Sequence, residues 1–83
     1  MELSETVALM NSSDYKERFK AEYFQTKIRC EKLHTMMVKR EAGTLGFEPV
    51  CSNVIFQRQK AYMQEYLKML EVRAEIEGID LSA

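Results

Sequence analysis

The sequence predicts an all-α protein, a hairpin of two long antiparallel helices that follows a short helical segment. The stretches 14–42 and 53–77 contain neither glycine nor proline, and both repeat apolar side chains at alternating spacings of four and three. The ten residues between them hold two of the three glycines and the single proline. We therefore expect helices at about 14–42 and 53–77 in one domain over 14–81, preceded by a leader at 1–13.

The leader before Asp14 has Leu3, Val7 and Met10 at spacings of four and three, which favours one or two helical turns. It ends in the sequence NSSD, four residues that prefer turns and helix caps. Asp14 followed by Glu17 forms an acidic variant of the capping box, so the first long helix should begin there.

The first long helix carries a heptad seam with a second apolar line beside it. The second line is formed by Tyr15, Phe24 and Ile28, and it makes the apolar surface wider than one partner helix would cover. We expect this helix to contact two neighbours. The seam itself consists of Phe19, Tyr23, Thr26, Cys30, Leu33 and Met37.

The join between the two long helices begins at Gly43. Lys39 and Arg40 lie in the turn before it, where cations suit the carbonyl end of the helix dipole. Ser52 or Asn53 can cap the next helix. The join is too apolar for a solvated linker, and we expect it to pack back over the end of the hairpin through Leu45, Phe47 and Val50.

The second long helix has two adjacent seams. One is interrupted once by Lys60 and otherwise consists of Phe56, Met63, Leu67, Leu70 and Ala74. The other, which has Gln59 and Arg73 among its positions, includes Ile55, Tyr62, Tyr66, Met69 and Ile76. Gly78 ends the helix, and Ile79 and Leu81 can fold onto its last turn in a Schellman-type cap. Because one antiparallel contact buries only one seam of each helix, the remaining seams predict a homo-oligomer.

Charge and cysteine content exclude several classes of function. The formal net charge is -1, from 12 basic and 13 acidic residues, which gives no field to hold duplex nucleic acid. The two cysteines, Cys30 and Cys51, are 21 residues apart without a second pair or a histidine cluster, which indicates free thiols in a cytoplasmic protein. No apolar stretch is long enough to span a membrane.

No catalytic signature is present, so we expect neither enzymatic activity nor a cofactor or metal. Tyrosines one turn apart, beside arginine side chains, can stack on a base and bind a phosphate. The same composition is typical of an ordinary oligomer interface, and that alternative stays open. The candidate ligand-binding residues are Arg58, Tyr62, Tyr66, Arg73, His34, Lys39 and Arg40.

Several segments carry a resemblance to a known family. They are EKLH at 31–34, EAGTL at 41–45, Pro49 with Cys51, and the run from Tyr66 through LEVRAEIEGI to Ile79. With them, the sequence resembles a family of small phage and prophage proteins related to a crAss-like phage product. That family has no established biochemical activity, so the resemblance implies phage origin.

The expected architecture is also similar to that of phage sponges, which capture the cyclic-nucleotide signals of CBASS and Thoeris immunity. This likeness implies a non-enzymatic counter-defence protein in an infected bacterial host, which sequesters a cyclic nucleotide or an ADP-ribose-type signal at oligomer interfaces. Two alternatives remain. One is an inhibitor of the anti-CRISPR type that binds a host defence protein, and the other is a structural or regulatory phage protein that only oligomerises.

Overall fold

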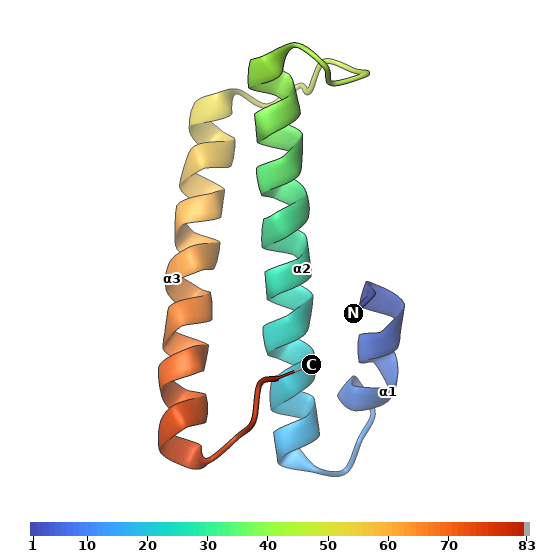
Figure 1. Ribbon diagram of the computed structural model, residues 1–83, viewed down its shortest axis with the longest axis vertical. Coiled ribbons are helices and arrows are strands. Elements are labelled where there is room, and N and C mark those ends of the chain that lie inside the picture. The colour runs from blue at the N-terminus through green and yellow to red at the C-terminus, as the bar shows by residue number, and fades with distance from the viewer. Residues whose placement is uncertain (83) are drawn as a thin grey trace.

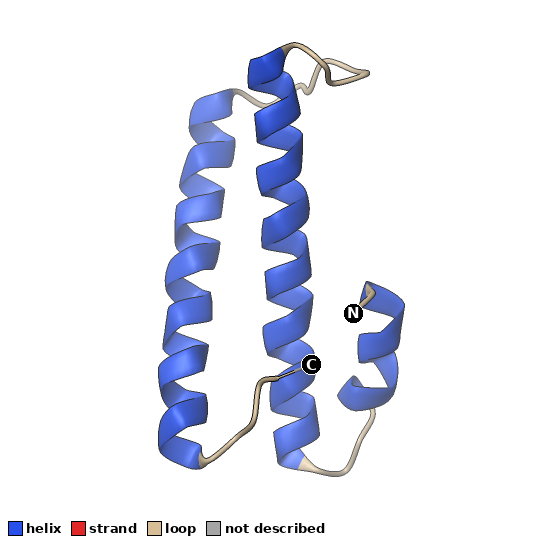
Figure 2. Cartoon of the chain, viewed as in Figure 1, coloured by secondary structure: helices blue, strands red, loops and turns tan. Residues whose placement is uncertain are grey.

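The computed structural model describes residues 1–82 and contains helices alone as regular elements over that range. A short 3-10 turn, Leu3–Glu5, leads into α1 (Thr6–Met10), which is followed by α2 (Tyr15–Ala42) and α3 (Asn53–Glu77). The two long helices run antiparallel, and α1 packs against the N-terminal half of α2 (Figures 1 and 2). The all-α hairpin with a short N-terminal helix is therefore confirmed.

The N-termini of both long helices are capped by side chains. Asp14 accepts a hydrogen bond from the backbone N–H of Lys16 at 3.0 Å, and Ser52 accepts one from Ile55 at 3.4 Å. The capping box predicted between Asp14 and Glu17 is not the arrangement found. The N–H of Asp14 donates instead to the hydroxyl of Ser12 at 3.0 Å, because a serine two residues away is already within reach.

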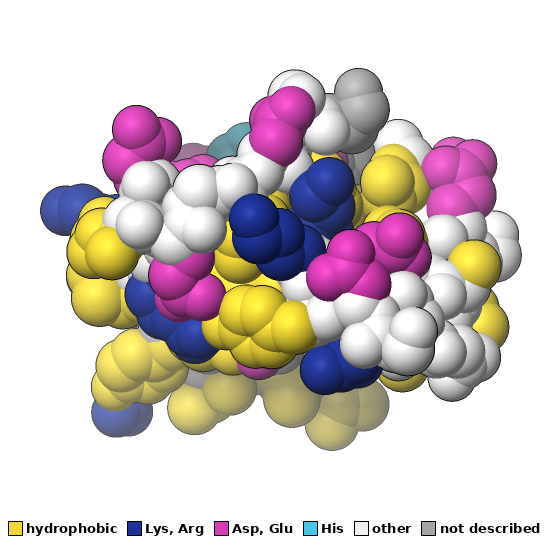
Figure 3. Space-filling view, turned by 90° about the horizontal axis from the view of Figure 1, so that it is seen from below, with side chains coloured by type: hydrophobic (Ala, Val, Ile, Leu, Met, Phe, Trp, Pro, Cys, Tyr) yellow, Lys and Arg dark blue, Asp and Glu magenta, His cyan; other side chains and the backbone are white. Residues whose placement is uncertain are grey.

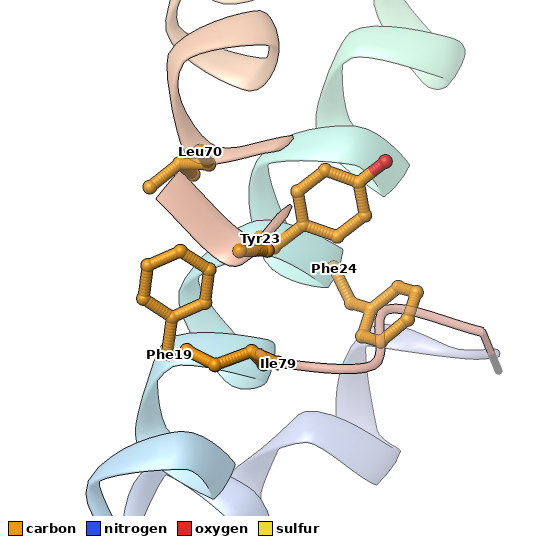
Figure 4. Close-up of a cluster of buried hydrophobic side chains, with 6 residues drawn as sticks. Phe19, Tyr23, Phe24, Leu70 and Ile79 are labelled. Atoms are coloured by element: carbon orange, nitrogen blue, oxygen red, sulfur yellow. The ribbon is translucent and has the colours of Figure 1, made fainter. Parts of the chain in front are cut away.

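The core lies at the end of the hairpin where α2 begins and α3 ends. Phe19, Tyr23 and Phe24 project from α2, Leu70 and Ala74 from α3, and Ile79 from the tail that follows (Figure 4). The rings of Tyr23 and Phe24 meet edge to face with centroids 5.2 Å apart. The tail crosses back toward α2, so three segments of the chain close this end (Figure 1).

The central position of α2 agrees with its two apolar lines. α2 packs against both α3 and α1, so it contacts two neighbours as expected. The predicted leader spacing missed the residue that matters most in α1, Thr6, which is fully buried. Its hydroxyl donates to the carbonyl of Leu3 at 2.6 Å and accepts from the amide of Gln25 at 3.0 Å. These two bonds satisfy the buried hydroxyl.

The join at the opposite end, which we call the tip, packs less than expected. Leu45 is half-buried, but Phe47 and Val50 are exposed, so the prediction that all three fold back is wrong. No third element covers the hairpin there, and the loop is held by polar contacts instead. The guanidinium of Arg40 donates to the carbonyl of Cys51 at 2.9 Å and to the carboxylate of Glu48 at 2.8 Å.

Each long helix ends in a glycine with left-handed backbone. Gly43 has φ +76° and Gly78 has φ +69°. After Gly78, the N–H of Ile79 donates to the carbonyl of Ala74 at 2.8 Å, which is the Schellman bond predicted from the sequence. Because this bond turns Ile79 into the core, the helix end and the core are formed together.

Gly78→Ala is expected to lower the free energy of unfolding by about 1 kcal/mol. A Cβ at this position meets no atom within 4 Å, so the cost is the left-handed backbone alone. Thermal or urea unfolding would measure it. The matched control is Gly46→Ala, which also has open space and lacks the positive φ. An equal loss in both variants would contradict this account.

Candidate functional site

A groove opens between the two long helices. It lies about midway along the hairpin, beyond the core, and has a volume of about 400 Å³. That volume is at the lower end of the range of small-molecule sites. Its walls come from one turn of α2 and one turn of α3, and are formed by Cys30, Glu31, His34, Thr35, Lys60 and Gln64.

The two basic side chains of the groove contact each other. Nζ of Lys60 is hydrogen-bonded to Nδ1 of His34 across the helix pair. An ammonium group has no acceptor, so Lys60 donates and Nδ1 of His34 accepts. The ammonium keeps two further N–H donors, which makes it the natural contact for an anion. Glu31 and Gln64 add acceptors for the donor groups of a ligand.

The groove forms where a charged side chain interrupts the apolar seam of α3. Lys60 occupies a position where the seam of α3 is otherwise apolar, between Phe56 and Met63. A half-buried lysine keeps its aliphatic stem between the helices and its ammonium near water. The apolar contact is thereby interrupted, and polar side chains line the gap.

The predicted tyrosines lie on a different face from the groove. Tyr62 is two residues from both Lys60 and Gln64, and residues two apart on a helix point about 200° away from each other. Tyr62 is exposed, and the hydroxyl of Tyr66 donates to Glu22 of α2. Of the seven predicted ligand-binding residues, His34 is the one that lines the groove.

The predicted arginines are also far apart. Arg58 and Arg73 are separated by roughly 22 Å along α3, at about 1.5 Å per residue. Arg73 belongs to a network at the base of the hairpin. It donates to Glu77 at 3.2 Å and to the hydroxyl of Tyr15 at 2.7 Å, and it stacks over Phe19 at 5.1 Å. No single small ligand can contact both arginines of one chain.

The basic residues at the tip, Lys39 and Arg40, lie apart from both the groove and the Arg73 network at the base. Arg40 is engaged by the loop, as described above, and Lys39 is exposed one residue before it. At the base of the hairpin, acidic and basic side chains lie next to one another with hydrophobic side chains between them (Figure 3). The predicted residues therefore do not converge on one site within a chain.

Among residues 1–82, no three histidine, cysteine or acidic side chains are close enough to hold a metal ion. Cys30 is buried and Cys51 is exposed, both as free thiols. No helix in the same range combines the length and apolarity needed to cross a membrane.

Comparison with known proteins identifies the family. The family model described as Sequestin matches residues 13–76. The chain belongs to the Sequestin family. No curated protein and no solved structure matches the chain.

The Sequestin match covers the long helices and leaves out α1. It takes in α2 completely and α3 up to its penultimate residue, Ile76. Every residue of the groove lies inside the matched range. The leader and the tail after Gly78, which close the base of the hairpin, lie outside it.

Sequence reasoning did not name Lys60 or Gln64, which line the groove, among the candidate ligand-binding residues. The signal was present, because Lys60 is the one charged interruption of an apolar seam and His34 is the only histidine. A cation inside a helix seam needs a polar partner on the facing helix. Antiparallel pairing from the tip places position 34 near position 60, so the two could have been connected.

Proposed function

We propose that this protein binds and sequesters a small anionic signal in the groove between α2 and α3, and does not convert it chemically. Membership of the Sequestin family is the observation that carries the proposal, since the family name refers to sequestration. The resemblance to phage proteins supports a role in phage counter-defence, in the cytoplasm of the infected host. The ligand class is then a cyclic nucleotide or an ADP-ribose-type signal.

The groove has the mixed chemistry that such a ligand requires. A nucleotide carries a phosphate that accepts hydrogen bonds, together with ribose hydroxyls and base edges that can donate them. Lys60 supplies the cation for the phosphate, with His34 behind it. Glu31 and Gln64 supply acceptors for the donor groups. The proposed site keeps His34 from the seven residues predicted from the sequence, and adds Lys60, Glu31 and Gln64.

Binding should weaken at least tenfold in Lys60→Met. The purified protein is titrated by calorimetry with a panel of cyclic dinucleotides, cyclic trinucleotides and cyclic ADP-ribose isomers. Lys68→Met is the matched control, because Lys68 is exposed on the same helix and does not line the groove. Equal loss in both variants would mean that net charge alone attracts the ligand.

Recovery of the bound ligand tests whether the protein acts as a sponge or an enzyme. The complex is denatured and the released molecule is identified by mass spectrometry. We expect the intact signal, at one ligand for each groove. A cleaved product would show an enzyme, and the absence of binding across the panel would overturn the proposal.

An inhibitor of a host defence enzyme is the second candidate. The exposed apolar side chains along α3 favour it, because such a surface on a small protein is typical of a protein contact. Purified defence enzymes would be assayed with and without this protein. Inhibition that persists in Lys60→Met and without any nucleotide would support this candidate over the first.

A further inference from the structure

The contact between Lys60 and His34 shows which imidazole nitrogen is free of a proton. Nζ of Lys60 lies 2.5 Å from Nδ1 of His34. Because an ammonium group can only donate, Nδ1 offers its lone pair and carries no proton while this bond exists. The two side chains come from facing turns of α2 and α3, so the bond also joins the two helices beside the groove.

A proton on Nδ1 would break the contact between these two side chains. The imidazolium form of His34 has two N–H donors and no acceptor, so Lys60 and His34 would present two positive charges at close range. Among residues 1–82, Lys60 has no ion-pair partner, and its four-carbon stem is flexible. In the empty groove, the pair is therefore compatible only with the unprotonated Nδ1.

The other groups that line the groove bring one negative charge near His34. From α2, the carboxylate of Glu31 lies one turn before His34, and the buried thiol of Cys30 lies one turn before it on the side of α3. From α3, Lys60 is the charged residue and the amide of Gln64 is uncharged. An anion that enters the groove thus finds Lys60 and His34 as the side chains able to carry positive charge.

We propose that an anionic ligand and a proton bind to this groove together, with the proton on His34. This inference rests on the proposed function, because it concerns the regulation of the same site. A phosphate oxygen between the two side chains accepts a hydrogen bond from the ammonium of Lys60 and another from the imidazolium of His34. Both bonds are charge-assisted, and the anion offsets the repulsion that opposes protonation in the empty groove.

The coupling between ligand and proton is reciprocal. If the ligand favours the protonated form of His34, lowering the pH increases the affinity for the ligand by the same factor. Imidazole groups titrate near physiological pH, so the affinity should rise about three- to tenfold between about pH 8 and about pH 6. At the higher pH, Lys60 contacts the phosphate while His34 stays its acceptor, so binding is weaker and is not lost.

Calorimetric titration at about pH 8 and at about pH 6 tests the coupling. The probes are cyclic di-AMP, cyclic tri-AMP and linear ADP-ribose, whose phosphates keep the same charge between these two pH values. Any change in affinity therefore belongs to the protein. We expect the three- to tenfold gain at the lower pH. Titrations in two buffers of different ionisation enthalpy should also show that a fraction of a proton is taken up with each ligand.

His34→Gln tests whether His34 takes up the proton. A glutamine offers Lys60 an acceptor and does not titrate. In this variant the ratio of the two affinities should fall to about one, and the proton uptake should disappear. Glu31→Gln is the matched control, since it changes another residue of the groove and leaves His34 in place, so it should keep the gain at the lower pH. Circular dichroism at both pH values shows whether each variant stays folded.

The outcomes separate this inference from the proposed function. Equal affinity at both pH values would overturn the inference and leave the proposed function intact. A gain that persists in His34→Gln would place the proton on another group and would also overturn the inference. If none of the three probes bound at either pH, both the inference and the proposed function would fail.

Discussion

Leu70→Ala is expected to lower the free energy of unfolding by about 3 kcal/mol. Leu70 is 1% exposed and is the largest side chain that is completely buried. It packs among the rings of Phe19 and Tyr23, which face it from α2 (Figure 4). Rings held by neighbours on three segments cannot collapse into the space that the methyl groups leave. The cavity therefore adds to the lost burial.

Urea unfolding at a fixed protein concentration measures this loss. The concentration must be fixed because self-association would raise the apparent stability. Val50→Ala is the control, since Val50 is fully exposed in the join and should change the stability by less than about 0.5 kcal/mol. A loss below about 1 kcal/mol in Leu70→Ala would mean that this cluster is not the main core.

Alkaline pH is expected to destabilise the protein through Tyr23. Burial, and then the hydrogen bond that its hydroxyl donates to Glu71 at 2.6 Å, raise the pKa of Tyr23 from 10.0 to about 12. The folded protein therefore keeps this proton at a pH where the unfolded chain releases it. The contribution is complete below pH 10 and is lost as the pH rises toward about 12, by about 2 kcal/mol.

Comparison with Tyr23→Phe isolates this contribution. The variant has no proton to lose at this position, whereas the lysines and the remaining tyrosines titrate in both proteins. The difference in unfolding free energy between the two proteins should be constant up to about pH 10. Above that value it should shift in favour of the variant. Parallel stability curves across this range would contradict the assignment.

The helices could be predicted because their signals are local. Asp14 and Ser52 act as caps, and Gly43 and Gly78 have the left-handed backbone that ends a helix. Each of these features depends on the residue and a few neighbours. The same holds for the seam positions, which follow from the period of the helix.

The join and the candidate site could not be predicted in the same way. Phe47 and Val50 were expected to be buried from their apolar character alone, but burial needs another element at the tip to pack against. The contact between His34 and Lys60 joins residues 26 apart, so it follows only from the register of the hairpin. The predicted tyrosines and arginines lie on one helix, but Arg58 and Arg73 are roughly 22 Å apart along it.

Because the core lies at the base of the hairpin, the base and the tip side differ in the free energy needed to open them. Amide hydrogens at the base should exchange with solvent only when the whole molecule unfolds, while those beyond the groove should exchange through local separation of the helices. Such separation removes the packing that supports the helix ends on the tip side, so their backbone hydrogen bonds open locally and their amides exchange. A ligand can then enter between the helices while the base stays closed, and its binding would slow exchange selectively on the tip side.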